Sequence, residues 1–256
     1  MELTNENYYT QEANREYMSC SQFKAFYKCE AAALAEIAEE YTRPESTALL
    51  VGSYVDSYFE GTLDGFKAAH PAIFKRDGTL KAEYTQAEDI IKRIERDPVF
   101  MMFMSGEKQR IMTGKIAGVP FKIKMDSFRP GTAIVDLKIM RDFEPIWSAE
   151  EHAKIPFVEY WGYDIQGAIY QEIVRQNCGE QLPFYIAAAT KEATPDIELL
   201  EVPQDRLDYC LEIVEEYAPR YQRLKAGIDE DAERCCKCDY CKSTKILLEP
   251  RDYRTL

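Results

Sequence analysis

The sequence predicts an α/β (α+β) fold in which helices pack against a central sheet. Stretches with apolar residues at helical spacing stand on both sides of stretches that alternate or run β-branched, a succession typical of that class. The composition, 46% hydrophobic and 12% aromatic, argues against a disordered chain. At 256 residues one large core can form. We therefore expect a single domain over residues 1–256, with residues 230–256 as a cysteine-rich appendage.

The helices of the first hundred residues are predicted from caps and breakers. Polar residues that cap helices precede them, and proline or glycine follows them. Residues 67–81, between the second and third helices, look irregular because they contain turn-forming residues. The expected boundaries are Ser19 or Ser21 before a helix at 22–41, Pro44 after it, Gly61 after a helix at 47–59, and Asp97–Pro98 after a helix at 85–96.

The middle of the chain changes to strand character. Residues 107–112, 115–125 and 132–139 alternate or run β-branched and are separated by turn signals, which predicts a short antiparallel meander. Helical patterns and two more strands follow. The expected elements are a helix at 160–177, strands at 183–190 and 197–202, and a long helix at 204–226.

Acidic and basic residues gather on this meander. Because side chains alternate between the faces of a strand, Asp126 shares a face with Lys122 and Lys124, and Asp136 shares one with Lys138. A short turn links the two strands, so we expect the two carboxylates and Lys138 to converge. Residues of these types are the ones that hydrolysis of a phosphodiester bond needs.

Two carboxylates can hold one or two Mg²⁺ ions that clamp a phosphate and activate a water molecule. A lysine beside them can orient that water or stabilise developing charge. The alternative is a solvated hairpin face with a Lys–Asp ion pair. Asp136 argues against it, because this aspartate interrupts an apolar run where an unpartnered charge is costly.

Asp126 followed by Asp136-Leu137-Lys138 resembles the PD-(D/E)XK nuclease motif. The resemblance implies a restriction-endonuclease-like core with a central mixed sheet. It also implies Mg²⁺ or Mn²⁺ bound by Asp126, Asp136 and the Leu137 carbonyl, with Lys138 positioning the attacking water.

Further positions resemble the same superfamily. Gln166 and Tyr170 form a Gln-x-x-x-Tyr pair on one helical face, which resembles the motif that assists DNA binding or orients the site in RecB-type and phage exonucleases. Asp56 stands where that branch often has a metal-binding histidine, and Glu107 matches an acidic residue at the start of the first strand. Glu107 or Asp56 is therefore expected to complete the metal shell.

The resemblance is greatest to the phage RecE and lambda exonuclease group. It implies an exodeoxyribonuclease of linear DNA in phage-type recombination, a single-strand annealing protein as partner, and a homo-oligomeric ring. One alternative is a RecB-like or CRISPR-adaptation-like single-strand nuclease. Another is a catalytically idle binding module, which the net charge of −13 favours because proteins that coat phosphates are usually basic.

The cysteines indicate a second site. Cys235, Cys238 and Cys241 form Cys-x2-Cys-x2-Cys, and a closed site needs a fourth ligand. Cys29 is the favoured fourth ligand, since helicase-associated and CRISPR-adaptation nucleases hold an iron–sulfur cluster with one cysteine before the nuclease core and three after it. The resemblance implies a [4Fe-4S] cluster, with Zn²⁺ as the alternative, and Cys236 could replace Cys235 in the register.

Location follows from what the sequence lacks. No apolar run approaches the roughly 20 residues of a membrane span, and the first residues are polar and acidic, unlike a signal peptide. We expect a cytoplasmic protein.

Overall fold

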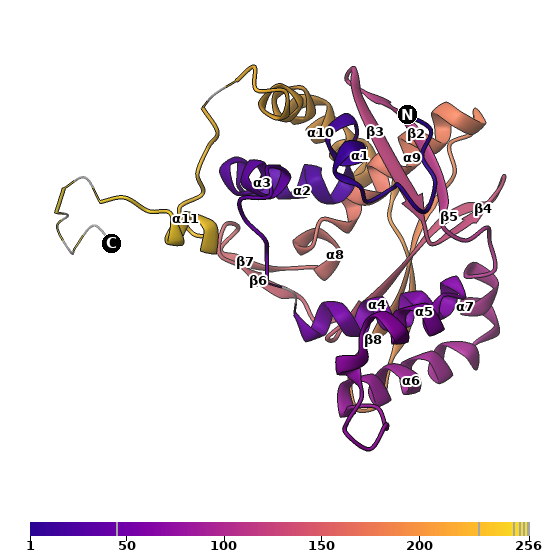
Figure 1. The fold of residues 1–256 in the computed structure, drawn as a ribbon. Helices are drawn as coiled ribbons and strands as arrows, with labels where there is room; N and C mark the ends of the chain where they lie inside the picture. Colours follow the sequence, from indigo (N-terminus) through magenta and orange to yellow (C-terminus); the bar gives the residue numbers. More distant parts are fainter. Residues whose placement is uncertain (45, 230, 248, 251, 253, 255–256) are drawn as a thin grey trace.

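The structure is a computed structural model that describes residues 1–44, 46–229, 231–247, 249–250, 252 and 254. Figure 1 shows its helices and strands along the chain. The helices are α1 Gln11–Glu16, α2 Cys20–Lys28, α3 Glu30–Ile37, α4 Thr47–Glu60, α5 Leu63–Ala69, η1 Pro71–Ile73 (a 3-10 helix), α6 Ala82–Glu95, α7 Pro98–Phe103, α8 Phe157–Tyr160, α9 Tyr163–Cys178, α10 Gln204–Lys225 and α11 Asp239–Ser243. The strands are β1 Met18–Ser19, β2 Arg110–Ile116, β3 Val119–Met125, β4 Ser127–Arg129, β5 Ala133–Met140, β6 Ile146–Ser148, β7 Ala153–Ile155, β8 Phe184–Thr190 and β9 Ile197–Glu201.

A four-stranded sheet in the order β4-β5-β8-β9 forms the centre of the molecule. Its β5–β8 pair is parallel and its outer pairs are antiparallel, so the sheet is mixed. A three-stranded sheet, β1-β3-β2, and the hairpin β6-β7 complete the strands. Since β5 and β8 run parallel, the chain returns between them through a crossover that contains α9.

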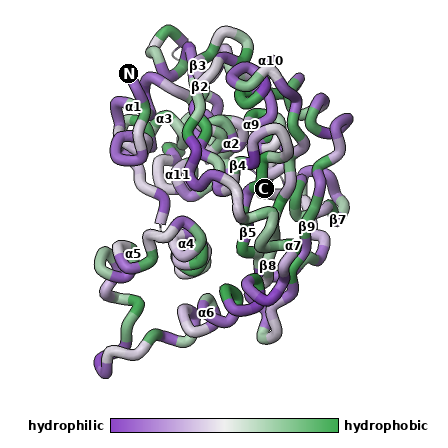
Figure 2. Tube along the Cα trace, turned by 90° about the vertical axis from the view of Figure 1, so that its right-hand side faces the viewer, coloured by the Kyte–Doolittle hydropathy of each residue, from purple (hydrophilic) through white to green (hydrophobic). Residues whose placement is uncertain are grey.

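Helices cover both faces of the four-stranded sheet. Along β5, Val135 and Leu137 join a core with residues of α4 and α6, whereas Ile134 joins the core of α9 and α10. This is the alternation expected of a strand buried on both faces. Figures 1 and 2 show α4, α5 and α6 as a layer set apart from α1, α2, α3 and α10.

Two elements that the sequence predicted as continuous are divided in the structure, so these predictions are wrong. The helix expected at 22–41 is two helices, α2 and α3, because Cys29 has an extended backbone with φ −167° and ψ 104°. The antiparallel meander is divided between two sheets, since the chain leaves β3 at Asp126 and continues as β4 in the other sheet. The stretch expected to be irregular at 67–81 contains the end of α5 and all of η1.

Other boundaries follow the chemistry that predicts them. Gly61 ends α4 with a left-handed φ of 77°, which glycine adopts without strain. Asp97 follows the C-cap of α6 and caps α7, because its Oδ1 accepts hydrogen bonds from the N–H groups of Val99 and Phe100. The long helix α10 continues through Pro219. The division of the chain into one domain and an appendage stays a prediction.

Within the described part of the chain, no helix combines the length and apolar character of a membrane-spanning segment.

Candidate active site

Asp126 occupies the bend between β3 and β4, where the chain changes sheets. Ser127 holds the bend: its Oγ donates to Phe103 O at 2.8 Å and accepts from Gly106 N at 2.9 Å. Gly106 is required for this close approach, because a Cβ there would lie 2.4 Å from Phe128 O. The bend therefore directs Asp126 toward β5, where its Oδ2 accepts a hydrogen bond from Leu137 N at 2.9 Å.

Asp136 and Lys138 lie in β5, on the side that faces α9. The Asp136 side chain is only 4% exposed and its Oδ2 forms an ion pair with Lys138 Nζ. Its Oδ1 accepts a hydrogen bond from Gln166 Nε2 at 2.6 Å. The Lys138 ammonium also lies 4.9 Å from the centre of the Tyr163 ring. A buried carboxylate requires such partners, because an unpaired charge in this environment costs several kcal/mol.

The negative charges of three carboxylates, Asp56, Asp126 and Asp136, repel one another around Lys138. Burial, and then the charge of Asp136, raise the pKa of Asp126 from 3.8 to about 7. Burial and the charges of Asp126 and Asp136 raise the pKa of Asp56, which comes from α4, well above its ordinary value. Lys138 opposes both shifts. Burial alone would lower the pKa of Lys138, but the charges of Asp136 and Asp126 hold it above the usual range.

The carboxylates fit a hard divalent cation. Asp56 Oδ1 is buried and has no hydrogen-bond partner among the described residues. Asp136 Oδ2 is also buried, and among the described residues its partner is the Lys138 ammonium. Oxygen atoms of this kind are the preferred ligands of Mg²⁺, and a bound cation would offset the repulsion between the acids.

Glu107, expected to be a further metal ligand, is not brought to these carboxylates. Its side chain is 52% exposed and lies 3.8 Å from Arg110, while its backbone pairs with Phe128. Glu60 contributes its charge instead, because it raises the pKa values of both Asp56 and Asp126. The sequence contained the signal for Glu60: it follows Asp56 by one helical turn on α4, so both lie on one face.

The Gln-x-x-x-Tyr pair lies on α9 beside the acids. Gln166 orients Asp136, and Tyr170 Oη donates to Lys124 O at 3.0 Å, which ties α9 to β3. Helix α9 also packs closely on β8, and Gly167 permits this packing, since a Cβ there would lie 2.6 Å from Phe184 Cδ1. Gln109 also contacts the site, because its Nε2 donates to Asp126 Oδ1 at 3.4 Å. It was not predicted, since a single glutamine in a loop forms no sequence pattern.

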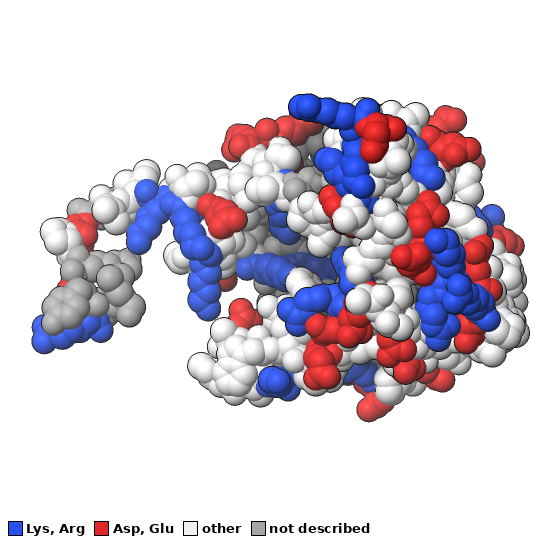
Figure 3. All heavy atoms as spheres, turned by 90° about the horizontal axis from the view of Figure 1, so that it is seen from below, with Lys and Arg blue, Asp and Glu red and all other residues white. Residues whose placement is uncertain are grey.

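A cavity of about 990 Å³ opens at the site, and Asp56, Leu137, Lys138, Gln166 and Tyr170 are among its lining residues. Its lining is basic although the chain carries a net charge of −13. Figure 3 shows several Lys and Arg side chains in and around a hollow on one face of the molecule. The acidic lining residues, Asp56 and Asp142, are outnumbered by the basic ones, Lys24, Lys122, Lys124, Lys138, Arg141 and Lys191. A phosphate backbone binds to positively charged surfaces. The lining provides such a surface locally, although the chain as a whole is acidic.

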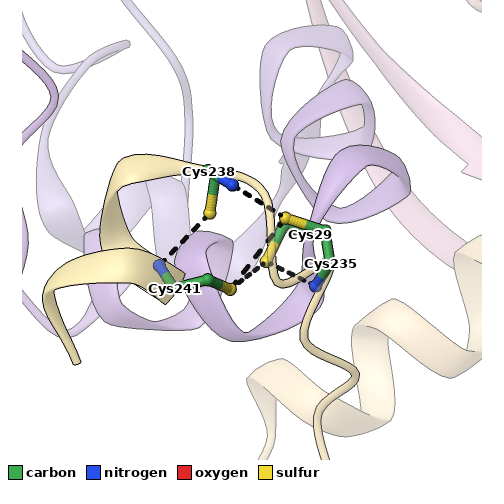
Figure 4. Close-up of side chains that lie close together, drawn as sticks. All are labelled: Cys29, Cys235, Cys238 and Cys241. Carbon is green, nitrogen blue, oxygen red and sulfur yellow. Dashed lines mark hydrogen bonds between the residues drawn. The ribbon is translucent and has the colours of Figure 1, made fainter. Parts of the chain in front are cut away.

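The four cysteines expected to form one site are close together. The sulfur atoms of Cys29, Cys235, Cys238 and Cys241 all lie within 4.8 Å of one another, and Figure 4 shows them pointing toward a common centre. Cys236 is exposed and its Sγ contacts Arg234 O instead, so the structure places Cys235 and not Cys236 in the group. The extended backbone at Cys29, which divides α2 from α3, lets this thiol meet the C-terminal cysteines.

The mixed sheet between helices and the acids beside Lys138 define the class: the fold is that of the PD-(D/E)XK nuclease superfamily, with a restriction-endonuclease-like core. Residues 19–244 match the family described as a PDDEXK-like domain of unknown function (DUF3799). The chain belongs to this family.

A solved structure gives a second comparison. The chain is 52% identical to a protein from Eubacterium rectale that carries a provisional exonuclease name, over 98% of this chain and 97% of that one, with a TM-score of 0.93. No curated protein matched the chain. The family and this relative together support a nuclease.

Proposed function

We propose that this protein is a Mg²⁺-dependent exodeoxyribonuclease that hydrolyses phosphodiester bonds of linear DNA. The observation that carries the proposal is the electrostatic interaction of Asp56, Asp126 and Asp136 with one another and with Lys138. Asp56 and Lys138 line a cavity that is rich in lysine. Carboxylates that repel one another, together with the buried Asp56 Oδ1 that has no hydrogen-bond partner among the described residues, favour metal binding. The lysines of the cavity lining favour a polyanionic substrate.

Asp126, Asp136 and the Leu137 carbonyl would hold the metal, with Asp56 completing the shell. When bound, Mg²⁺ or Mn²⁺ supplies Lewis acidity toward the phosphate and lowers the pKa of a water molecule. We do not include Glu107 in this shell, although the sequence predicted it as a ligand, because its side chain lies beside Arg110.

The protein's own side chains position the reacting groups. Lys138 keeps its proton next to Asp136, so its ammonium can orient the nucleophilic water and offset charge that develops on the phosphate. Gln166 fixes Asp136 through the 2.6 Å hydrogen bond. Tyr170 acts through the backbone of Lys124 and is a positioning residue. Such fixed geometry lowers the reorganisation that the reaction requires.

The test is digestion of end-labelled linear duplex DNA with Mg²⁺ or Mn²⁺, with a closed circle as the control for end dependence. Wild-type protein should degrade the linear duplex, while Asp136→Asn and Lys138→Met should not. If purified wild-type protein degrades neither DNA with either metal, the proposal fails. Binding of DNA without cleavage would then favour the catalytically idle binding module.

A specific observation favours a second candidate, the trimming of single strands. The cavity lining includes Tyr9, Tyr160 and Trp161, whose side chains are exposed. Exposed aromatic rings beside lysines are how proteins stack unpaired bases. A blunt duplex and a single-stranded oligonucleotide of the same sequence distinguish the two candidates by their relative rates of cleavage.

Participation in phage-type recombination, a single-strand annealing partner, assembly into a ring and a cytoplasmic location are predictions that rest on the sequence and its resemblance alone.

A further inference from the structure

The four-cysteine site has the dimensions of a mononuclear centre. A tetrahedral metal with metal–sulfur bonds of 2.3 Å sets its sulfur atoms about 3.8 Å apart. The Sγ atoms of Cys29 and Cys241 are 3.5 Å apart, and those of Cys235 and Cys241 are 3.9 Å apart. No pair in the group exceeds 4.8 Å. These distances match a single metal ion.

The same distances do not fit a [4Fe-4S] cluster. Each cysteine of such a cluster binds a different iron, which places the thiolate sulfurs about 6 Å apart. To admit the cluster, Cys29 would have to move away from Cys235 and Cys241, although Cys29 is 6% exposed and Cys241 is 3% exposed. The arrangement therefore departs from the iron–sulfur nucleases that the cysteine order resembles.

Backbone hydrogen bonds prepare the sulfurs for a metal. Cys238 N donates to Cys235 Sγ at 3.3 Å, and Cys241 N donates to Cys238 Sγ at 3.4 Å. Cys235 N donates to Cys29 Sγ at 3.5 Å. Donors around a ligand atom orient it and stabilise its negative charge. Three of the four sulfurs therefore receive an N–H group.

An ion pair outside the group holds the two chain segments together. The Arg220 guanidinium binds both oxygens of Glu30 at 2.7 and 2.8 Å. Glu30 Oε2 also accepts from Glu233 N at 2.8 Å, and Ala31 N donates to Glu233 O at 3.0 Å. These bonds bring the chain before Cys235 against the start of α3. The sulfur spacing is therefore set by the surrounding structure, and not by sulfur contacts alone.

We propose that Cys29, Cys235, Cys238 and Cys241 form a structural Zn²⁺ site that fastens the C-terminal segment to the junction of α2 and α3. Four thiolates in tetrahedral arrangement favour zinc, which is redox-inert and needs no open coordination position in such a site. The junction matters for the cavity because α2 carries Lys24, whose Nζ donates to Trp161 O at 3.2 Å. The site thus supports one wall of the cavity without contacting the reacting groups.

Metal and sulfide analysis of full-length protein purified under anaerobic conditions tests the proposal independently of nuclease activity. We expect about one zinc per chain, negligible iron and no absorbance near about 400 nm. Stoichiometric iron with inorganic sulfide would overturn the proposal, and so would protein without any bound metal. Anaerobic handling ensures that a cluster, if present, is not lost to oxidation.

Variants identify the ligands. Cys238→Ser and Cys29→Ser should lose most of the zinc and lower the Tm, while the matched control Cys236→Ser should keep the zinc and Tm of the wild type. If the ligand variants do not fold, titration of wild-type protein with a mercurial reagent still decides. The exposed Cys178 and Cys236 should react first without loss of zinc, and the zinc should be released as the four ligand thiols then react together. Zinc that survives Cys238→Ser, or release that does not follow thiol modification, contradicts the assignment.

Discussion

Asp126→Asn should make the metal-free protein more stable while removing its response to Mg²⁺. The substitution keeps the shape of the side chain, and the amide oxygen can still accept the hydrogen bond from Leu137 N. The new NH2 group replaces Oδ1, which accepts from Gln109 Nε2 at 3.4 Å, so the Gln109 amide must turn to present its Oε1, which has no hydrogen-bond partner among the described residues. It removes a negative charge that Asp136 and burial both oppose. An active-site acid that serves metal binding is expected to cost stability in this way.

The magnitude follows from the pKa. A rise from 3.8 to about 7 corresponds to about 4 kcal/mol at pH 8, at about 1.4 kcal/mol per pKa unit. This is an upper limit, because the side chain is partly exposed and solvent screens part of the repulsion. We expect a gain of about 1–3 kcal/mol at pH 8. Because a raised carboxyl pKa weakens the fold as pH rises from 3.8 to about 7, the gain should be smaller at pH 5.

Urea denaturation followed by far-UV circular dichroism in EDTA at pH 5 and pH 8 measures this gain. Asp142→Asn is the matched control: Asp142 lines the same cavity, but the Arg141 hydrogen bond lowers its carboxyl pKa, so the control should gain no stability. Addition of Mg²⁺ should raise the Tm of wild-type protein and not of Asp126→Asn. An Asp126→Asn protein less stable than wild type at pH 8, or equally stabilised by Mg²⁺, would refute the reasoning.

Three further predictions concern residues around the site. Lys138→Met removes the cation that pairs with buried Asp136 and leaves Gln166 as its hydrogen-bond partner. In EDTA it should therefore lower the free energy of unfolding by about 3 kcal/mol. Mg²⁺ should restore part of that loss in a urea titration. Gly167→Ala places a methyl group against Phe184 and Leu207 and should cost about 1–3 kcal/mol by the same measurement, whereas Gly65→Ala, where a Cβ meets nothing within 4 Å, should not. Burial lowers the pKa of Lys122 from 10.5 to about 8. Wild-type protein should therefore gain stability relative to Lys122→Met as pH rises from about 8 toward 10. If the free energy of unfolding changes equally with pH in the two proteins, this prediction is wrong.

The sequence predicted the central strands and the site on them because local patterns specify both. The β-branched run around Asp136 is buried on both faces of the sheet, and a charge within such a run requires partners. Lys138 and Gln166, both predicted as site residues, are those partners. Boundaries set by caps and breakers, such as Gly61 after α4, were predictable for the same reason.

Features that depend on distant contacts were not predictable. Nothing local indicates that Cys29 interrupts a helical segment, because the reason lies in its meeting with Cys241, 212 positions along the chain. The change of sheets at Asp126 depends on Ser127 bonding to Phe103 and Gly106. The lysines of the cavity come from separate elements of the fold. The composition, with a net charge of −13, therefore gives no indication of a basic cavity.

The central claim is that Asp126 and Asp136 hold a divalent metal beside Lys138. Crystals of the wild-type protein soaked in MnCl₂ and measured at a wavelength where manganese scatters anomalously test it directly. We predict an anomalous peak between the two aspartates, within about 2.0–2.3 Å of an oxygen from each, with Asp56 turned toward it. Manganese bound elsewhere on the protein, with none between Asp126 and Asp136, would contradict the account.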